Sequence, residues 1–235
     1  MNKEDITRRA LLGAGGVLVA AAAAEQAVAQ SVAQSLPDGI KGANVSLIAS
    51  AMGKMGLDPA KYSMTTDIKP LVDTGKTIIG PAVTCKWELG KLDDVEDINK
   101  YVYDPVDAAP KGSIWVIASG TEEIYSMFGD IITQAAKRNG MLGAVTDSGC
   151  RDIDEMKKQG FAVFAKSTIP FGPKGLKPTG ANVPVTCGGV TVNPGDLIAA
   201  DIDGVIVMPK EHLENLNAAI ATHLAFERDV RVKVD

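Results

Sequence analysis

Short apolar runs alternate with amphipathic segments through the middle of the chain. The runs "SIWVIAS" (113–119), "MLGAVTD" (141–147) and "FAVFAKST" (161–168) are bounded by Gly, Pro or polar residues, which predicts buried strands. Between them, residues 124–138 repeat apolar positions at helical spacing, and residues 152–160 predict a second helix. This strand–helix–strand–helix–strand order predicts a parallel βαβ core, and therefore an α/β fold.

The flanking segments predict elements of both kinds. Further strands are expected at residues 76–87, with a Gly-Pro break, and at 185–192, 196–201 and 204–209. The last three follow one another through short polar turns, which is typical of antiparallel strands. Further helices are expected at residues 40–56, 65–72, 91–104 and 211–227. The Pro/Gly-rich stretch 169–184 predicts a long loop.

The first 29 residues predict an export signal rather than part of the fold. Arg8 and Arg9 precede a Gly/Ala-rich apolar run to Ala24, and Ala27-Val28-Ala29 offers a cleavage site. The run is shorter than the roughly 20 apolar residues that a membrane span needs, so no anchor is expected after cleavage. The arginine pair is typical of a twin-arginine signal, which predicts a periplasmic protein. Residues 30–39 then read as a polar lead-in.

The composition of the chain mainly excludes classes of function. The net charge is −5 and no basic patch stands out, so nucleic acid is not an expected partner. The sequence has only two histidines, which disfavours both a Cys/His zinc site and a Ser-His-Asp triad. Plentiful acids favour oxygen ligands, and hence Mg²⁺ or Mn²⁺, for any bound metal. The three cysteines lack CxxC spacing and are expected to be buried, unpaired thiols.

The stretch "TDSGCRDIDE" (146–155) allows two interpretations. In the structural one, Asp152 is a helix N-cap and Glu155 completes a capping box. In the functional one, Asp147, Arg151 and Asp152 follow a parallel strand, at the edge where α/β sheets bind ligands.

A second group of candidates lies one strand–helix junction earlier. "GDII" (129–132) falls near the start of the preceding helix, where free backbone N–H groups bind carboxylates. Neighbouring parallel strands would bring this segment close to Arg151. Backbone donors, one cation and the carboxylates of Asp130 and Asp152 suit a small 2-oxo acid chelated by a divalent cation.

These residues also carry a resemblance to a known family. "FGDIITQAAKRNGMLGAVTDSGCRD", with "GFAVFAKSTIP" and "VTCGGVTVNPGDLIAADIDGVIVMP", resembles the RraA-like proteins, which include class II 4-hydroxy-4-methyl-2-oxoglutarate aldolases. The family's aldolases carry an acid, twenty residues and then Arg-Asp, as do Asp130 and Arg151-Asp152 with residues 131–150 between them. Regulatory members that bind ribonuclease E typically lack that acid. One departure is Ser148, where the family usually has Gly.

The resemblance implies a fold, a reaction and a set of roles. The fold is an α/β/β sandwich, with a catalytic domain at 40–209 and a helix and tail at 210–235. The reaction is metal-dependent cleavage of a 4-hydroxy-2-oxo acid to pyruvate, with oxaloacetate decarboxylase activity, in a homotrimer or homohexamer. By resemblance, Asp152 ligates Mg²⁺ or Mn²⁺, and Asp130 orients a water on that ion. Arg151 steadies the developing enolate, and the backbone of Gly129, Asp130, Ile131 and Ile132 holds the substrate carboxylate.

Other interpretations stay open. The chain could be a non-catalytic binding or regulatory protein on the same fold. A methyltransferase is disfavoured, because no Gly-rich S-adenosylmethionine loop follows an early strand. Cys150 is expected to be a buried thiol rather than a nucleophile. For the remaining conspicuous residues the structural interpretation is favoured: turns for Asp196, Asp201 and Asp203, solvated positions for His212 and His223, and the core for Trp87 and Trp115.

Overall fold

The computed structural model describes residue 36 and residues 38–234, so the predicted signal at 1–29 lies outside the described residues. The strands are β1 (Lys69–Val72), β2 (Ile78–Leu89), β3 (Ile114–Ala118), β4 (Gly143–Thr146), β5 (Gly149–Cys150), β6 (Ala162–Ala165), β7 (Ser167–Thr168), β8 (Leu176–Ala181), β9 (Val185–Cys187), β10 (Val190–Val192), β11 (Leu197–Asp201) and β12 (Gly204–Met208). The α-helices are α2 (Asp38–Lys41), α3 (Val45–Lys54), α4 (Asn99–Asp107), α5 (Asp130–Arg138), α6 (Ile153–Gln159) and α7 (Leu213–Val234), and 3₁₀ turns cover Pro59–Lys61, Leu92–Asp94 and Lys210–His212. Among these helices none is long and apolar enough to cross a membrane.

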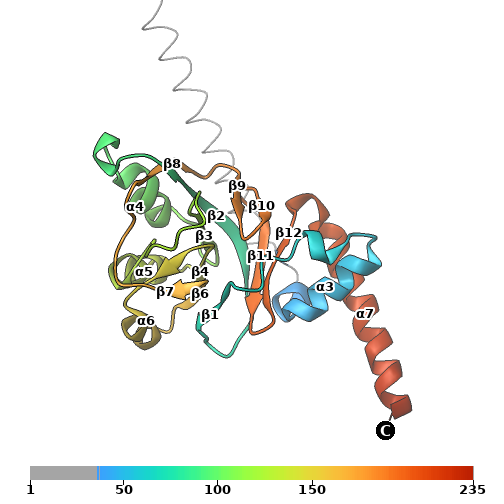
Figure 1. The fold of residues 1–235 in the computed structure, drawn as a ribbon. Coiled ribbons are helices and arrows are strands. Elements are labelled where there is room, and N and C mark those ends of the chain that lie inside the picture. The colour runs from blue at the N-terminus through green and yellow to red at the C-terminus, as the bar shows by residue number, and fades with distance from the viewer. Residues whose placement is uncertain (1–35, 37, 235) are drawn as a thin grey trace, which may run out of the picture.

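One curled, mixed sheet organises the molecule (Figure 1). Its strand order is β1-β6-β4-β3-β2-β11-β12, and β8 also pairs with β2. The neighbours β2, β3, β4 and β6 are parallel, which confirms the βαβ core. β11 and β12 are antiparallel, which confirms the prediction for that pair.

Helices and further strands cover the sheet, and each covering layer packs against the sheet around its own apolar core. Helices α4, α5 and α6 lie on one face of the parallel strands, over a core that includes Trp115 and Phe161. On the opposite face, the hairpin β9–β10 and the strands β11 and β12 fold over Val116 and Val145. α3 and α7 pack on the far side of β11 and β12. The predicted α/β class, with an antiparallel C-terminal part, is confirmed.

The Gly-Pro break expected in the strand at 76–87 marks a change of partner. β2 continues through it, but Gly80 pairs with β11, whereas Ala82 begins the parallel pairing with β3. A Cβ at Gly80 would lie 1.9 Å from the carbonyl oxygen of Gly112, so only glycine fits at this crossing.

Two predictions are wrong in segments where a proline lies within a strand. The expected helix at 65–72 is wrong, since its second half forms β1, with Pro70 paired to Phe164 of β6. The expected loop at 169–184 contains β8, where Pro178 pairs with Trp87. Both strands lie at the rim of the sheet, where a residue without an N–H group costs no ladder hydrogen bond.

Local side-chain contacts divide three other predicted elements. The helix expected at 40–56 is two helices, because Asn44 accepts the N–H of Leu47 and starts α3. The helix expected at 91–104 is a 3₁₀ turn and then α4, because Asp97 accepts the N–H of Asn99. The strand expected at 185–192 is a hairpin, whose turn residues Gly188 and Gly189 both have positive φ.

Candidate active site

The helix expected at 124–138 begins only at Asp130. Because of this later start, residues 129–132 form the first turn of the helix. Ser126 bridges to Gly149 in parallel fashion, and the N–H of Met127 donates to the carbonyl of Gly149 at 2.9 Å. The segment before Asp130 is therefore extended, beside the small parallel pair β5–β7. As a consequence, "GDII" is the first turn of α5, with Gly129 as its N-cap residue.

Asp152 reaches toward this helix start rather than capping its own helix. Its Oδ2 accepts the backbone N–H of Asp130 at 3.3 Å and lies 3.5 Å from Nε of Arg151. No side-chain bond caps α6, so the predicted capping box with Glu155 is wrong. A carboxylate at a helix N-terminus is electrostatically favourable, and here that helix is α5.

The backbone of Asp152 explains why its side chain points there. Its φ of 61° and ψ of 35° place it in the left-handed region, which few residues other than glycine adopt. Gly129 leaves the space that the carboxylate occupies, because a Cβ on Gly129 would lie 2.4 Å from Oδ2 of Asp152. A strained residue and a required glycine thus meet at one point, as functional sites often show.

The structure brings some of the predicted site residues into contact but not the side chains of others. Gly129, Asp130, Arg151 and Asp152 converge, and Arg151 is anchored by its N–H to the carbonyl of Phe128 at 3.2 Å. The side chains of Ile131 and Ile132 take no part, since the first is 76% exposed and the second lies in the core. Their amides belong to the free first turn of α5.

Asp147 and Ser148 have structural roles beside the site. Asp147 Oδ1 accepts the N–H of Ser119 at 2.8 Å, which ties the ends of β4 and β3 together. The Ser148 hydroxyl accepts the N–H of Tyr125 at 2.9 Å and donates to the carbonyl of the same residue at 3.1 Å. Ser148 does not have a positive φ. The departure from the family's glycine therefore leaves the turn intact and fixes the extended segment.

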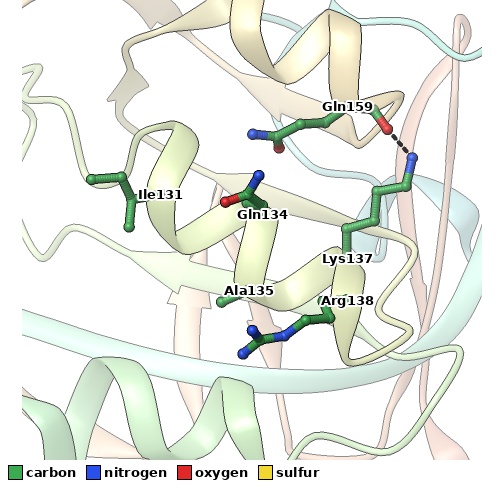
Figure 2. Close-up of a pocket in the computed structure, with 6 residues that line it drawn as sticks. All are labelled: Ile131, Gln134, Ala135, Lys137, Arg138 and Gln159. Carbon is green, nitrogen blue, oxygen red and sulfur yellow. Dashed lines mark hydrogen bonds between the residues drawn. The ribbon is translucent and has the colours of Figure 1, made fainter.

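Two cavities adjoin this region. The larger, about 620 Å³, lies between α5 and the end of α6, where Gln159 accepts a hydrogen bond from Lys137 (Figure 2). Its charged lining residues are Lys137 and Arg138, without an acid to complement them. The smaller, about 400 Å³, is lined by Arg151, Asp152, Ile153, Thr168, Ile169 and Pro170. We call the smaller one the site cavity, because of the two it is the one lined by Arg151 and Asp152, which we call the charge pair.

The donor set fits a hard cation that is bound only partly by protein. Within the described part of the chain, no three His, Cys, Asp or Glu residues lie close enough to form a complete metal cage. Asp152 is available, with its side chain 39% exposed. Mg²⁺ commonly takes one or two carboxylates and completes its shell with water and substrate oxygens, so Asp152 fits that mode of binding.

Cys150 is buried next to the charge pair. Burial raises the pKa of its thiol to about 12, and the Asp152 carboxylate adds to the rise. The neutral thiol is a poor nucleophile, which supports the prediction of a buried, inert cysteine. All three cysteines are buried and free, as predicted.

Sequence reasoning missed two parts of the site. Gln159 donates to the carbonyl of Asp130 at 3.1 Å and accepts the hydroxyl of Thr133 at 3.1 Å, tying the end of α6 to the start of α5. No sequence motif marks a lone glutamine of this kind. Ile169 and Pro170, which line the site cavity, fall in the predicted loop, although "FAKSTIP" is among the motifs that carry the family resemblance.

Residues away from the site are largely structural, as expected. Asp196 accepts the N–H groups of Asn193 and Lys210, and Asp201 accepts the N–H of Val45, so both hold turns or a helix start. The prediction of a solvated His223 is wrong, because its side chain is only 14% exposed and lies 3.2 Å from Glu227. Both tryptophans are buried.

Comparison with known proteins places this geometry in context. A family model named RraA-like, described as Aldolase/RraA, matches residues 45–207. "Putative 4-hydroxy-4-methyl-2-oxoglutarate aldolase" of Halalkalibacterium halodurans is 35% identical over 154 residues, which is 66% of this chain and 70% of that protein. "Protein DlpA" of Legionella pneumophila is 32% identical over 187 residues, 79% of this chain but only 29% of DlpA. The chain thus spans less than a third of that relative.

A solved structure agrees with the fold. Streptomyces coelicolor RraAS2, described as an unusual member of the RNase ES inhibitor RraA protein family, superimposes with a TM-score of 0.73. The match covers 84% of this chain and 97% of that one, at 23% identity.

Proposed function

Because the chain belongs to the RraA-like family, we propose that it is a divalent-metal-dependent lyase that cleaves a 4-hydroxy-2-oxo acid to pyruvate and also decarboxylates oxaloacetate. The name of the Halalkalibacterium relative, a 4-hydroxy-4-methyl-2-oxoglutarate aldolase, supports the lyase class. The proposal rests on one observation: Oδ2 of Asp152 lies 3.3 Å from the backbone N of Asp130 at the α5 N-terminus and 3.5 Å from Nε of Arg151, and Arg151 and Asp152 both line the site cavity.

Substrate binding uses the two fixed sources of positive potential. The free N–H groups of Ile131 and Ile132 hold the C1 carboxylate, because Asp152 already accepts the N–H of Asp130. The Arg151 guanidinium donates to the 2-oxo oxygen, and its planar fork suits that contact better than a point charge. Asp152 would hold the divalent ion, Mg²⁺ or Mn²⁺, whose positive charge withdraws electrons from the 2-oxo acid.

The residues of this chain then stabilise charge and return a proton. In the aldol cleavage, a water directed by Asp130 takes the proton of the C4 hydroxyl, the C3–C4 bond breaks, and its electron pair remains on the three-carbon fragment as pyruvate enolate. Arg151 stabilises that negative charge as it forms, an effect typically worth about 10²–10³-fold in rate. Asp130 directs a water that returns a proton to C3, which gives pyruvate, and such acid–base help adds roughly 10²–10⁴-fold.

Oxaloacetate decarboxylation follows the same course. Its C3–C4 bond breaks to release CO₂, and the same enolate is protonated at C3. Neither reaction needs a Schiff base, and no lysine occurs among the described residues that line the site cavity.

The test is pyruvate release from oxaloacetate, followed by NADH consumption with lactate dehydrogenase. Protein-dependent turnover with Mg²⁺ that excess EDTA abolishes is expected, after the metal-only background is subtracted. Asp154→Asn is a matched control for site variants, since Asp154 lies two residues from Asp152 and its side chain is 88% exposed. A folded protein that releases no pyruvate from oxaloacetate or from an aldol would instead be a binding or regulatory protein on this fold.

Two further expectations remain proposals. We propose that the chain assembles as a homotrimer or homohexamer, which light scattering of the purified protein would establish. We also propose twin-arginine export to the periplasm, with cleavage after Ala29. N-terminal sequencing of the secreted protein, beside an Arg8→Lys/Arg9→Lys variant that is retained, would test this.

A further inference from the structure

Both peptide groups of Asp130 are held by the two ends of one helix. Asp152, the N-cap residue of α6, accepts the N–H of Asp130 at 3.3 Å. Gln159, the last residue of α6, donates from Nε2 to the carbonyl of Asp130 at 3.1 Å. The first turn of α5 is therefore fastened to α6 at two points, and one of them is a neutral amide outside the charge pair.

The orientation of the Gln159 amide follows from its partners. The carbonyl oxygen of Asp130 can only accept, so the amide nitrogen must face it. The other end of the amide, Oε1, then faces the hydroxyl of Thr133 at 3.1 Å. Thr133 is fully buried, and its hydroxyl also lies 3.1 Å from the carbonyl of Gly129. Both ends of the Gln159 amide thus have partners in the first turn of α5, which fixes the side chain.

Metal binding would affect the two fastenings differently. In the proposed reaction the carboxylate of Asp152 holds the divalent ion, and the same Oδ2 makes the long 3.3 Å bond to Asp130. That bond would weaken when the carboxylate takes the ion, because both draw on the same oxygen. Gln159 carries no charge and contacts the opposite peptide group, so its bond to Asp130 persists.

We propose that Gln159 is a positioning residue for the lyase reaction, which holds Asp130 at the place from which its carboxylate directs water. This inference rests on the lyase function proposed above. Ile132 is anchored independently, since its side chain is only 7% exposed and lies in the core beneath α5. Its amide, which is proposed to bind the substrate carboxylate, therefore depends less on Gln159. Loss of Gln159 should lower kcat more than it raises KM.

The first test replaces Gln159 by methionine, which keeps the length of the side chain and removes both hydrogen bonds. With the full mature chain, Mg²⁺ and oxaloacetate, we expect kcat for pyruvate release to fall about tenfold, since small misplacements of a catalytic group cost up to about 100-fold. KM should change by less than about threefold, because substrate binding keeps its anchored amide.

Lys137→Met is the matched control. Lys137 also joins α5 to the end of α6, by donating to the carbonyls of Gln159 and Gly160, but it does so from the last turn of α5 (Figure 2). Its removal loosens the same pair of helices away from Asp130, and kcat should equal that of the native chain.

A double-mutant cycle tests whether Gln159 acts through Asp130. In an Asp130→Asn background, Gln159→Met should lower the residual kcat by no more than about twofold, because the group that it positions is already lost. A general weakening of the fold would instead cost the same tenfold in both backgrounds, which would overturn the inference.

Amide hydrogen exchange of the metal-free protein supplies a readout that does not depend on turnover. In the peptide covering residues 129–136, Gln159→Met should speed exchange about two- to tenfold, and Lys137→Met should not. Unchanged exchange in Gln159→Met, or an unchanged kcat, would show that Gln159 does not hold Asp130, with the lyase function intact. If the native chain releases no pyruvate from oxaloacetate or an aldol, the lyase function is wrong and the catalytic role of Gln159 with it.

Discussion

Asp152 combines an unusual backbone conformation with a side chain placed for chemistry, and substitutions can separate the two. Its left-handed φ of 61° affects stability, whereas its carboxylate, which contacts Asp130 and Arg151, carries the metal-binding role proposed above. We consider three replacements at this position. Glycine tolerates the left-handed backbone conformation. Asparagine tolerates it and also keeps the shape of the side chain, whereas alanine does neither.

The magnitudes follow from these contacts. A residue with a Cβ pays about 1–2 kcal/mol in the left-handed region, and Asn and Asp pay less than Ala because their short polar side chains bond locally. A carboxylate at a helix N-terminus is worth about 0.3–1 kcal/mol, and toward the lower end here because the Asp152 side chain is 39% exposed. Asp152→Gly and Asp152→Asn should therefore stay within about 1 kcal/mol of the native unfolding free energy, and Asp152→Ala should lose about 1–2 kcal/mol.

Activity should follow a different order from stability. All three variants lose the charge that would hold the metal, so each should lose at least about 100-fold in kcat for pyruvate release. Urea unfolding gives the stabilities, and Asp154→Asn should match the native protein in both assays. The reasoning about the carboxylate is refuted if Asp152→Asn keeps more than a tenth of native turnover. The reasoning about the backbone is refuted if Asp152→Ala proves as stable as Asp152→Gly.

Four further outcomes are expected. Arg151→Lys should lower kcat/KM about 10²-fold or more, since a point charge cannot replace the planar fork; near-native kinetics would remove Arg151 from the site. Gly129→Ala should fold but impair turnover, because its Cβ displaces the Asp152 carboxylate, and unchanged rates would contradict that geometry. Ellman's reagent should find no reactive thiol in the native protein, including Cys150, and three after unfolding in urea. Burial raises the pKa of Asp196 above its ordinary 3.8, so its contribution to stability is full below that value and is lost as pH rises through the higher folded value. Asp196→Asn should therefore show a smaller fall in unfolding free energy between about pH 4 and pH 7 than the native chain, by urea titration at each pH.

The parallel core could be predicted because its signals are local. The strands at 113–119, 141–147 and 161–168 are short apolar runs with Gly or polar boundaries, and burial on both faces of a parallel sheet makes such runs apolar throughout. The predictions that are wrong concern segments whose structure depends on their position in the sheet. Pro70 and Pro178 are tolerated only because β1 and β8 lie at its rim, which the sequence does not reveal.

The sequence predicted that Asp130, Arg151 and Asp152 lie close together, but not how their contacts are made. Spacing placed Asp130 near a helix start, yet the apolar repeat extended that helix back to residue 124. Pairing of Ser126 with Gly149 overrides the helical pattern, because a partner strand is available only in the folded chain. In the same way, "DIDE" carries a valid capping-box pattern, and the left-handed backbone of Asp152 directs the carboxylate to a different helix.

A small second layer of extended backbone explains how these parts are held together. Ser126, the pair Gly149–Cys150 and the pair Ser167–Thr168 lie side by side beyond the ends of the parallel strands. Backbone hydrogen bonds hold this layer, so its side chains can change without moving its strands. Arg151 and Asp152 directly follow the middle strand, β5, and Ile169 and Pro170 directly follow β7 beside it. Because backbone pairing holds the layer, side chains at Ile169 and Pro170 can be substituted while Arg151 and Asp152 keep their places.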